Sequence, residues 1–145
     1  MEKSLMLLPF VHGIDGSALS CALAFAQEMN ATLLLVSLIR LPSDPRGKKV
    51  RAEAFAQRQD FFEVMTHKAA RAGVITRCIP ISTSEVARSI QLLAQEMACA
   101  GLLLFVRNGK GVLLEIEDIK QLLEQTNQSI YLFRLPTRKY FQIRT

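Results

Sequence analysis

Short apolar runs alternate along the chain with longer segments in which apolar residues recur every three or four positions. Side chains at that spacing share one face of a helix, whereas short apolar runs bounded by turn residues predict strands. The runs that predict strands cover residues 5–11, 31–39, 74–81, 102–106 and 129–135. The segments that predict helices cover residues 18–29, 50–72, 82–99 and 113–125. Strands and helices therefore alternate from one end of the chain to the other.

This alternation predicts an α/β fold class with a doubly wound parallel sheet, because successive parallel strands need a helical crossover between them. The run ATLLLVSLI at 31–39 is apolar throughout, which is typical of a central strand buried on both faces. The 145 residues fall within the usual length of one domain. We expect that domain to span residues 1–136, and residues 137–145 to form a polar, basic tail.

Polar and flexible residues mark where the predicted helices begin and end. Asp15 and Ser17 each offer a side-chain oxygen that can cap the first helix. Gly73 suits a left-handed residue at the end of the second helix. Ser82 and Glu85 match a capping box for the third helix, with Ser82 as the cap.

Basic residues outnumber acidic ones, and the formal net charge is +5. The excess lies mainly in one loop and in the tail, at Arg46, Lys48, Lys49, Arg51, Arg138, Lys139 and Arg144. Such patches attract nucleic acid or anionic lipid, but the chain carries no helix-turn-helix, RRM or zinc-finger signature. We therefore expect a solvated basic surface and no nucleic-acid partner.

The sequence also bears on the compartment. No apolar run reaches the roughly 18 residues that a membrane span needs, and the first residues, MEKSLMLLPF, lack the features of a signal peptide. Cys21, Cys78 and Cys99 lie far apart and show neither metal-ligand nor disulfide spacing, which is typical of reduced thiols. The sequence thus predicts a cytoplasmic protein without a transmembrane segment.

The stretch from LLPF to DGSALSCALAFAQEMNATLLLVSLI resembles the opening of the universal stress protein family. In that family the first strand ends in Pro-x-Asp-Gly-Ser, and a helix and a second apolar strand follow. The later order, from the helix ending at Cys99 through LLLFV to SIYLF, is also similar. The resemblance implies a five-stranded sheet of the adenine nucleotide alpha hydrolase type, with strand order 3-2-1-4-5. It also implies ligand contacts at Pro9, Asp15 and Leu38.

The glycine motif that binds phosphate in nucleotide-binding members of this family is damaged. When the fourth strand is aligned, the first glycine of Gly-x-x-Gly falls on Val106 and the second on Gly109. The Gly-Ser or Gly-Thr pair that should follow falls on Ile119-Lys120, or on Ile116-Glu117 when counted back from the last strand. Neither alignment supplies a small residue plus a hydroxyl, so we predict that the ATP site is broken.

Acidic residues at 115, 117 and 118 strengthen this prediction, since carboxylates there oppose the charge of a phosphate. The loop Arg107 to Gly111 is still a candidate anion site. Gly109 and Gly111 free the backbone to form an amide nest, and Arg107 and Lys110 add positive charge. A monophosphate, AMP or cyclic AMP would suit such a site better than ATP. The alternative is a charged turn between a strand and a helix.

Relative to the family, His12-Gly13-Ile14 is extra sequence before Asp15. It either moves Asp15 away from the pocket or fills the pocket with His12; the alternative role for Asp15 is that of a helix cap. Neither His12 nor His67 has a nucleophile partner, and no His, Cys and Asp cluster has metal-ligand spacing. We expect no catalytic residue, no metal and no cofactor. ATP or AMP binding, and weak ATPase activity, are expected only if the degenerate loop still holds a nucleotide.

The predicted function is a non-enzymatic regulatory or stress-response module that does not bind ATP. The resemblance implies a homodimer paired through the last strand, where Ile130, Leu132 and Phe133 supply an apolar edge. One alternative is a sensor that binds AMP, cyclic AMP or another small adenylate or anion. Another is a basic adaptor that docks on a membrane transporter or on nucleic acid. A protein partner is compatible with each of these functions.

Overall fold

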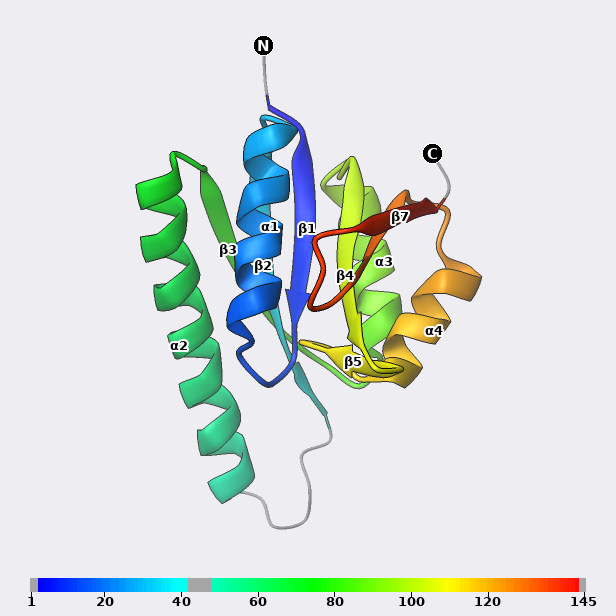
Figure 1. Ribbon diagram of the computed structural model, residues 1–145. Coiled ribbons are helices and arrows are strands. Elements are labelled where there is room, and N and C mark those ends of the chain that lie inside the picture. Colours follow the sequence, from blue (N-terminus) through cyan, green and yellow to red (C-terminus); the bar gives the residue numbers. More distant parts are fainter. Residues whose placement is uncertain (1–2, 42–47, 144–145) are drawn as a thin grey trace.

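The structure is a computed structural model that describes residues 3–41 and 48–143, with the backbone alone at 48–51. The side chains of the basic loop cluster, Arg46, Lys48, Lys49 and Arg51, and of Arg144 lie outside the described residues. The strands are β1 Leu5–Phe10, β2 Thr32–Arg40, β3 Thr76–Thr83, β4 Gly101–Arg107, β5 Lys110–Val112, β6 Ile130–Arg134 and β7 Tyr140–Ile143. The helices are α1 Gly16–Glu28, α2 Lys48–Ala72, α3 Val86–Glu96 and α4 Ile116–Gln125 (Figure 1).

The strands form one seven-stranded sheet in the order β3-β2-β1-β4-β6-β7, with the short strand β5 paired to β4. Neighbouring strands from β3 to β6 are parallel, whereas β5 and β7 run antiparallel to their partners. Helices α1 and α2 cover one face of the sheet, and α3 and α4 cover the other (Figure 1). This confirms the predicted fold class and the order of the five predicted strands, of which β6 is the fifth. The predicted total of five strands is wrong, because β5 and β7 add two antiparallel strands.

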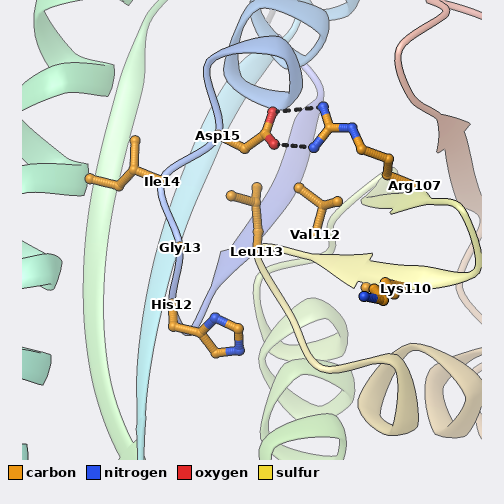
Figure 2. Close-up of a pocket in the computed structure, with 9 residues that line it drawn as sticks. His12, Gly13, Ile14, Asp15, Arg107, Lys110, Val112 and Leu113 are labelled. Atoms are coloured by element: carbon orange, nitrogen blue, oxygen red, sulfur yellow. Dashed lines mark hydrogen bonds and ion pairs between the residues drawn. The ribbon is translucent and has the colours of Figure 1, made fainter.

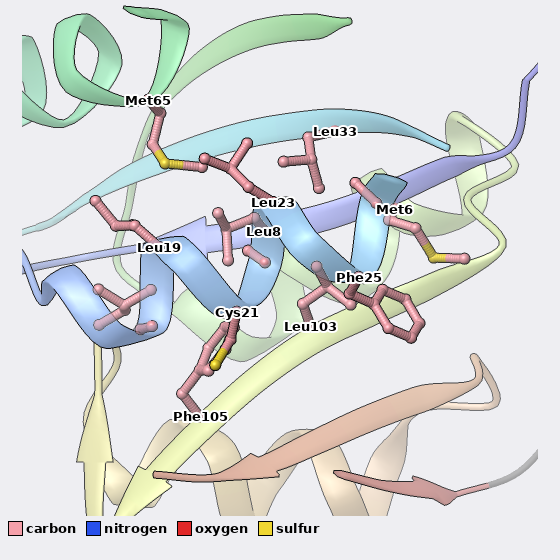
Figure 3. Packing of buried hydrophobic residues seen from close by; sticks show 14 of the residues in the cluster. Met6, Leu8, Leu19, Cys21, Leu23, Phe25, Leu33, Met65, Leu103 and Phe105 are labelled. Carbon is pink, nitrogen blue, oxygen red and sulfur yellow. The ribbon is translucent and has the colours of Figure 1, made fainter. Parts of the chain in front are cut away.

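Helices α1 and α2 pack on the middle of the sheet through buried apolar side chains (Figure 3). Leu19 and Phe25 of α1 and Leu8 of β1 belong to one continuous cluster there. The ring of Phe61 on α2 stacks on Phe10 at the end of β1, with 4.3 Å between ring centroids. Each such buried side chain contributes about 1.5–3 kcal/mol to folding, so this cluster fixes the end of β1 relative to both helices.

Strand β2 is buried along nearly its whole length, as the unbroken apolar run predicted. It pairs with β1 on one side and with β3 on the other. Leu33 and Leu35 belong to the core under α1 and α2, whereas Leu34 and Leu38 belong to the core under α3. Both faces of the strand are therefore covered, which explains why its sequence shows no polar alternation.

The predicted capping box at the start of α3 is wrong. Strand β3 continues through Ser82 to Thr83, and α3 begins at Val86 with Glu85 as a cap that makes no side-chain capping bond. The Thr83 hydroxyl oxygen accepts a hydrogen bond from the Glu85 amide at 3.0 Å. Ladder pairing opposite Ile39 holds Ser82 in an extended strand, which keeps it away from the helix end.

The last described residues form strand β7, where the sequence predicted a polar tail. In its antiparallel pairing with β6, Tyr140 lies opposite Phe133 and Ile143 lies opposite Ile130. Strand β6 thus has β4 on one side and β7 on the other and is not an edge strand. The expectation that Ile130, Leu132 and Phe133 form a free edge is therefore wrong, and Ile130 and Phe133 are buried within the chain.

Candidate functional site

The candidate site lies at the carboxyl ends of β1 and β4. The chain leaves β1 toward β2 on one side and returns to β4 on the other, so strand order reverses between these two strands. In open α/β sheets, ligands bind in the crevice at such a reversal. A hollow of about 320 Å³ lies there, lined by residues 12–15 after β1 and by residues 107 and 110–113 around β5 (Figure 2).

The loop after β4 is a β-hairpin. Arg107 and Lys110 lie opposite each other in the β4–β5 ladder, which leaves Asn108 and Gly109 as a two-residue turn. Both turn residues have positive φ, 52° and 76°, which is the geometry of the tight turn that Asn-Gly favours. The loop therefore reverses the chain, as the charged turn that the sequence offered as the alternative to an amide nest would do.

Gly111 has a different structural role. A Cβ placed on it would lie 2.2 Å from the backbone oxygen of Leu114 and 2.8 Å from the amide nitrogen of Ile116. Any side chain at this position would therefore collide with the backbone that leads from the hairpin into α4. Glycine at 111 allows that backbone to fold back against β5.

Asp15 and Arg107 face each other across the hollow (Figure 2). The two guanidinium nitrogens of Arg107 donate to the two carboxylate oxygens of Asp15, at 2.5 and 3.3 Å. The same carboxylate accepts from the Ala18 amide at 3.0 Å and caps α1, as predicted. Hydrogen bonding to Arg107, together with the Ala18 amide, lowers the pKa of Asp15 although partial burial acts in the opposite direction.

The segment after β5 occupies the backbone donors at the end of β1. The carbonyl oxygen of Leu113 accepts from the amides of Val11 at 2.8 Å and His12 at 3.3 Å. Leu113 is buried and has a φ of 72°, a conformation that a bulky side chain adopts rarely. Beside it, the imidazole Nε2 of His12 lies 2.7 Å from Oε1 of Glu115, and both side chains are about half exposed.

A further ion pair joins the end of β2 to α4. Arg40 donates to the carboxylate of Asp118 at 2.5 Å, and the Asp118 side chain is only 7 % exposed. Two of the three acidic residues expected to repel phosphate, Glu115 and Asp118, thus have partners elsewhere in the chain, the His12 imidazole and the Arg40 guanidinium. Of these contacts, those of His12 and of Asp15 with Arg107 involve residues that line the hollow.

The structure separates the residues that the sequence singled out. His12, Asp15, Arg107, Lys110 and Gly111 line one hollow. The remaining three, Pro9, Leu38 and Gly109, do not line it: Pro9 and Leu38 are buried in strands β1 and β2, and Gly109 lies at the hairpin tip.

Arg40 and Leu113 were missed by the sequence interpretation. The sequence did contain an indication of a site at Arg40, because it is the first charged residue at the carboxyl end of a buried strand. It contained none of the conformation of Leu113, because that conformation follows from contacts with residues far away in the sequence.

Within residues 3–41 and 48–143, no group of three or more His, Cys, Asp and Glu side chains is arranged to hold a metal ion. In the same part of the chain, no helix combines the length and the apolar character that crossing a membrane requires.

No protein-family model matches the sequence, and no curated protein is significantly similar to it. Solved structures do match. A universal stress protein family member from Burkholderia pseudomallei superposes with a TM-score of 0.68 at 18% identity, over 93% of this chain and 97% of that one.

The universal stress protein from Archaeoglobus fulgidus in complex with dAMP superposes with a TM-score of 0.66 at 13% identity, over 91% of this chain and 98% of that one. A universal stress protein in complex with cAMP superposes with a TM-score of 0.59 at 14% identity, over 91% of this chain and 97% of that one. At these identities the likeness shows the fold: this chain has the universal stress protein fold, as the resemblance of its sequence implied.

Proposed function

We propose that this chain is a regulatory module of the universal stress protein type that acts without catalysis and without bound ATP. One observation carries the proposal: groups of the chain itself engage donors at the crevice that a phosphate could use. The Leu113 carbonyl accepts from the amides at the end of β1, and Arg107 donates to the Asp15 carboxylate. A triphosphate that used these donors would have to displace those contacts.

The charges at α4 support the same proposal. A phosphate binds well at a helix start when free amides and positive charge meet it there. Here the first turn of α4 carries Glu117 and Asp118. Asp118 is buried and held by its ion pair with Arg40, so the cation at the end of β2 is already engaged and not free for a phosphate.

The second candidate is a sensor for AMP, cyclic AMP or a related small adenylate. The hollow beside Asp15 favours it, because Lys110 lines that hollow and forms no ion pair with a carboxylate of the described residues. Two proteins of the same fold were solved with dAMP and cAMP. A single phosphate would need less room than three, and release of Arg107 from Asp15 would provide a second cation.

The universal stress protein fold and the position of β7 at the edge of the sheet together support a homodimer. We propose that two copies pair through β7, which replaces β6 at the edge of the sheet. Phe141 of β7 is 55% exposed and would become buried in that pairing.

The three cysteines form no disulfide, which fits action in the reducing cytoplasm.

A thermal-shift titration with ATP, AMP, cyclic AMP and adenosine, with and without magnesium, tests the proposal. A ligand that binds only the native state adds about 2.7 kcal/mol of stability at a hundredfold excess over its Kd. The proposed module shows no shift with ATP. A shift with AMP or cyclic AMP that disappears in Arg107→Gln would support the adenylate sensor. A shift with ATP that also depends on Arg107 would overturn the proposed function.

A further inference from the structure

A second hollow, of about 450 Å³, lies over the first two turns of α1. None of the described residues that line it also lines the crevice. They come from three separate segments: Gly16, Ser17, Ser20 and Cys21 of α1, Lys68 of α2, and Pro136 and Arg138 of the β6–β7 connection. Ser17 and Ser20 are three residues apart, so their hydroxyls share one face of the helix.

Two exposed, positively charged side chains, Lys68 and Arg138, line this hollow. Lys68 comes from α2 and Arg138 from the other end of the chain, so only the tertiary structure brings them together. Neither forms an ion pair with a carboxylate of the described residues. Like charges that face one hollow raise its local potential, and an anion placed between them lowers it.

Arg138 and Cys21 line the same hollow. Burial raises the pKa of the Cys21 thiol, while the positive charge of Arg138 acts in the opposite direction. At the start of α1, the carboxylate of Asp15 accepts a hydrogen bond from the Ala18 amide. Asp15 is in turn paired with Arg107, so its charge is largely offset.

We propose that this hollow binds the phosphate group of a small phosphate monoester, with Lys68 and Arg138 contacting the dianion and the hydroxyls of Ser17 and Ser20 donating hydrogen bonds to it. Two cations match the two charges of a phosphate monoester. Arginine also presents a planar set of donors that fits two phosphate oxygens at once. The volume exceeds that of a phosphate alone and leaves space for an organic group.

The test uses the full chain labelled with ¹⁵N, and inorganic phosphate and glycerol 3-phosphate as probes. Glycerol and sodium chloride at equal ionic strength serve as reference titrations. We expect saturable shifts of the Ser17, Ser20 and Cys21 amide signals with both phosphates and none with glycerol. Lys68→Gln and Arg138→Gln should each weaken binding about tenfold, the loss expected for one charge-assisted hydrogen bond.

Two neighbouring cations that do not line the hollow supply matched controls. Arg71→Gln removes a charge one turn later on α2, and Lys139→Gln removes one from the residue beside Arg138. Both should change the affinity less than about twofold, because neither side chain lines the hollow and a longer-range charge effect is weakened by salt. Equal weakening by the controls, or no saturable shift beyond that of chloride, would overturn the proposal. Shifts confined to residues 107–113 would place the phosphate in the crevice and overturn it as well.

Discussion

Arg107, at the end of β4, and Asp15, at the cap of α1, form a two-point ion pair across the crevice (Figure 2). The carboxylate has two structural roles, because it also accepts a hydrogen bond from the Ala18 amide and so caps α1. The pair therefore ties the start of α1 to the central sheet. It also engages two guanidinium nitrogens of Arg107 that could otherwise donate to a phosphate.

Replacing Asp15 separates these two roles. Asp15→Ala removes both the helix cap and the ion pair, and we predict a loss of about 1–3 kcal/mol in the free energy of unfolding. Asp15→Asn keeps a capping oxygen and loses the charge, so its loss should be smaller. Urea denaturation of both variants measures the difference. No loss in either variant would contradict the assigned role of the pair.

The ion pair should also make stability depend on pH. Hydrogen bonding to Arg107 holds the pKa of the Asp15 carboxyl below its ordinary value of 3.8. A group whose pKa is lower in the folded state stabilises the fold above its unfolded pKa, and this contribution is lost as the pH falls through the folded pKa. The gap in unfolding free energy between the native chain and Asp15→Asn should be full near neutral pH and should shrink as the pH falls below 3.8. A gap that widens in acid would contradict the sign.

Gly111→Ala should destabilise the chain by about 1–3 kcal/mol, because the added methyl group meets the backbone between Leu114 and Ile116 and forces it to move. Gly16→Ala is the matched control, since a Cβ there meets no atom within 4 Å and the residue opens a helix. Thermal unfolding of the two variants gives the comparison. Similar melting temperatures for both would show that the segment before α4 is not held against the hairpin.

The proposed dimer predicts that the mass in solution depends on Phe141. Light scattering after size exclusion should give twice the chain mass at high micromolar concentration, and the single chain mass for Phe141→Lys. The apolar side chain stands on an edge strand, where a lysine opposes pairing with another edge. Leu92→Lys on α3 is the control, because Leu92 is similarly exposed at 46% and belongs to a helix, not to the edge strand. A native chain that stays monomeric would contradict pairing through β7.

Much of the fold follows from local patterns along the chain. The buried run of β2, the cap at Asp15 and the left-handed Gly73 at the end of α2 each depend on a few neighbouring residues, and the structure confirms all three. The Asn-Gly dipeptide after β4 is itself a strong hairpin signal. The structure forms that turn, which is the alternative to an anion site that the sequence left open.

Tertiary structure alone decided the rest of the candidate site. The partners of Arg107 and Arg40 lie 92 and 78 residues away, and no local pattern encodes such pairings. Strand β7 pairs with β6, and its Tyr140 packs against Phe25 of α1, a residue far away in the sequence. Leu113 takes a positive φ because its carbonyl meets the end of β1. The sequence by itself determined which elements form and in which order, because those depend on short-range periodicity. Which charges meet across the crevice was decided by how the sheet brings distant loops together.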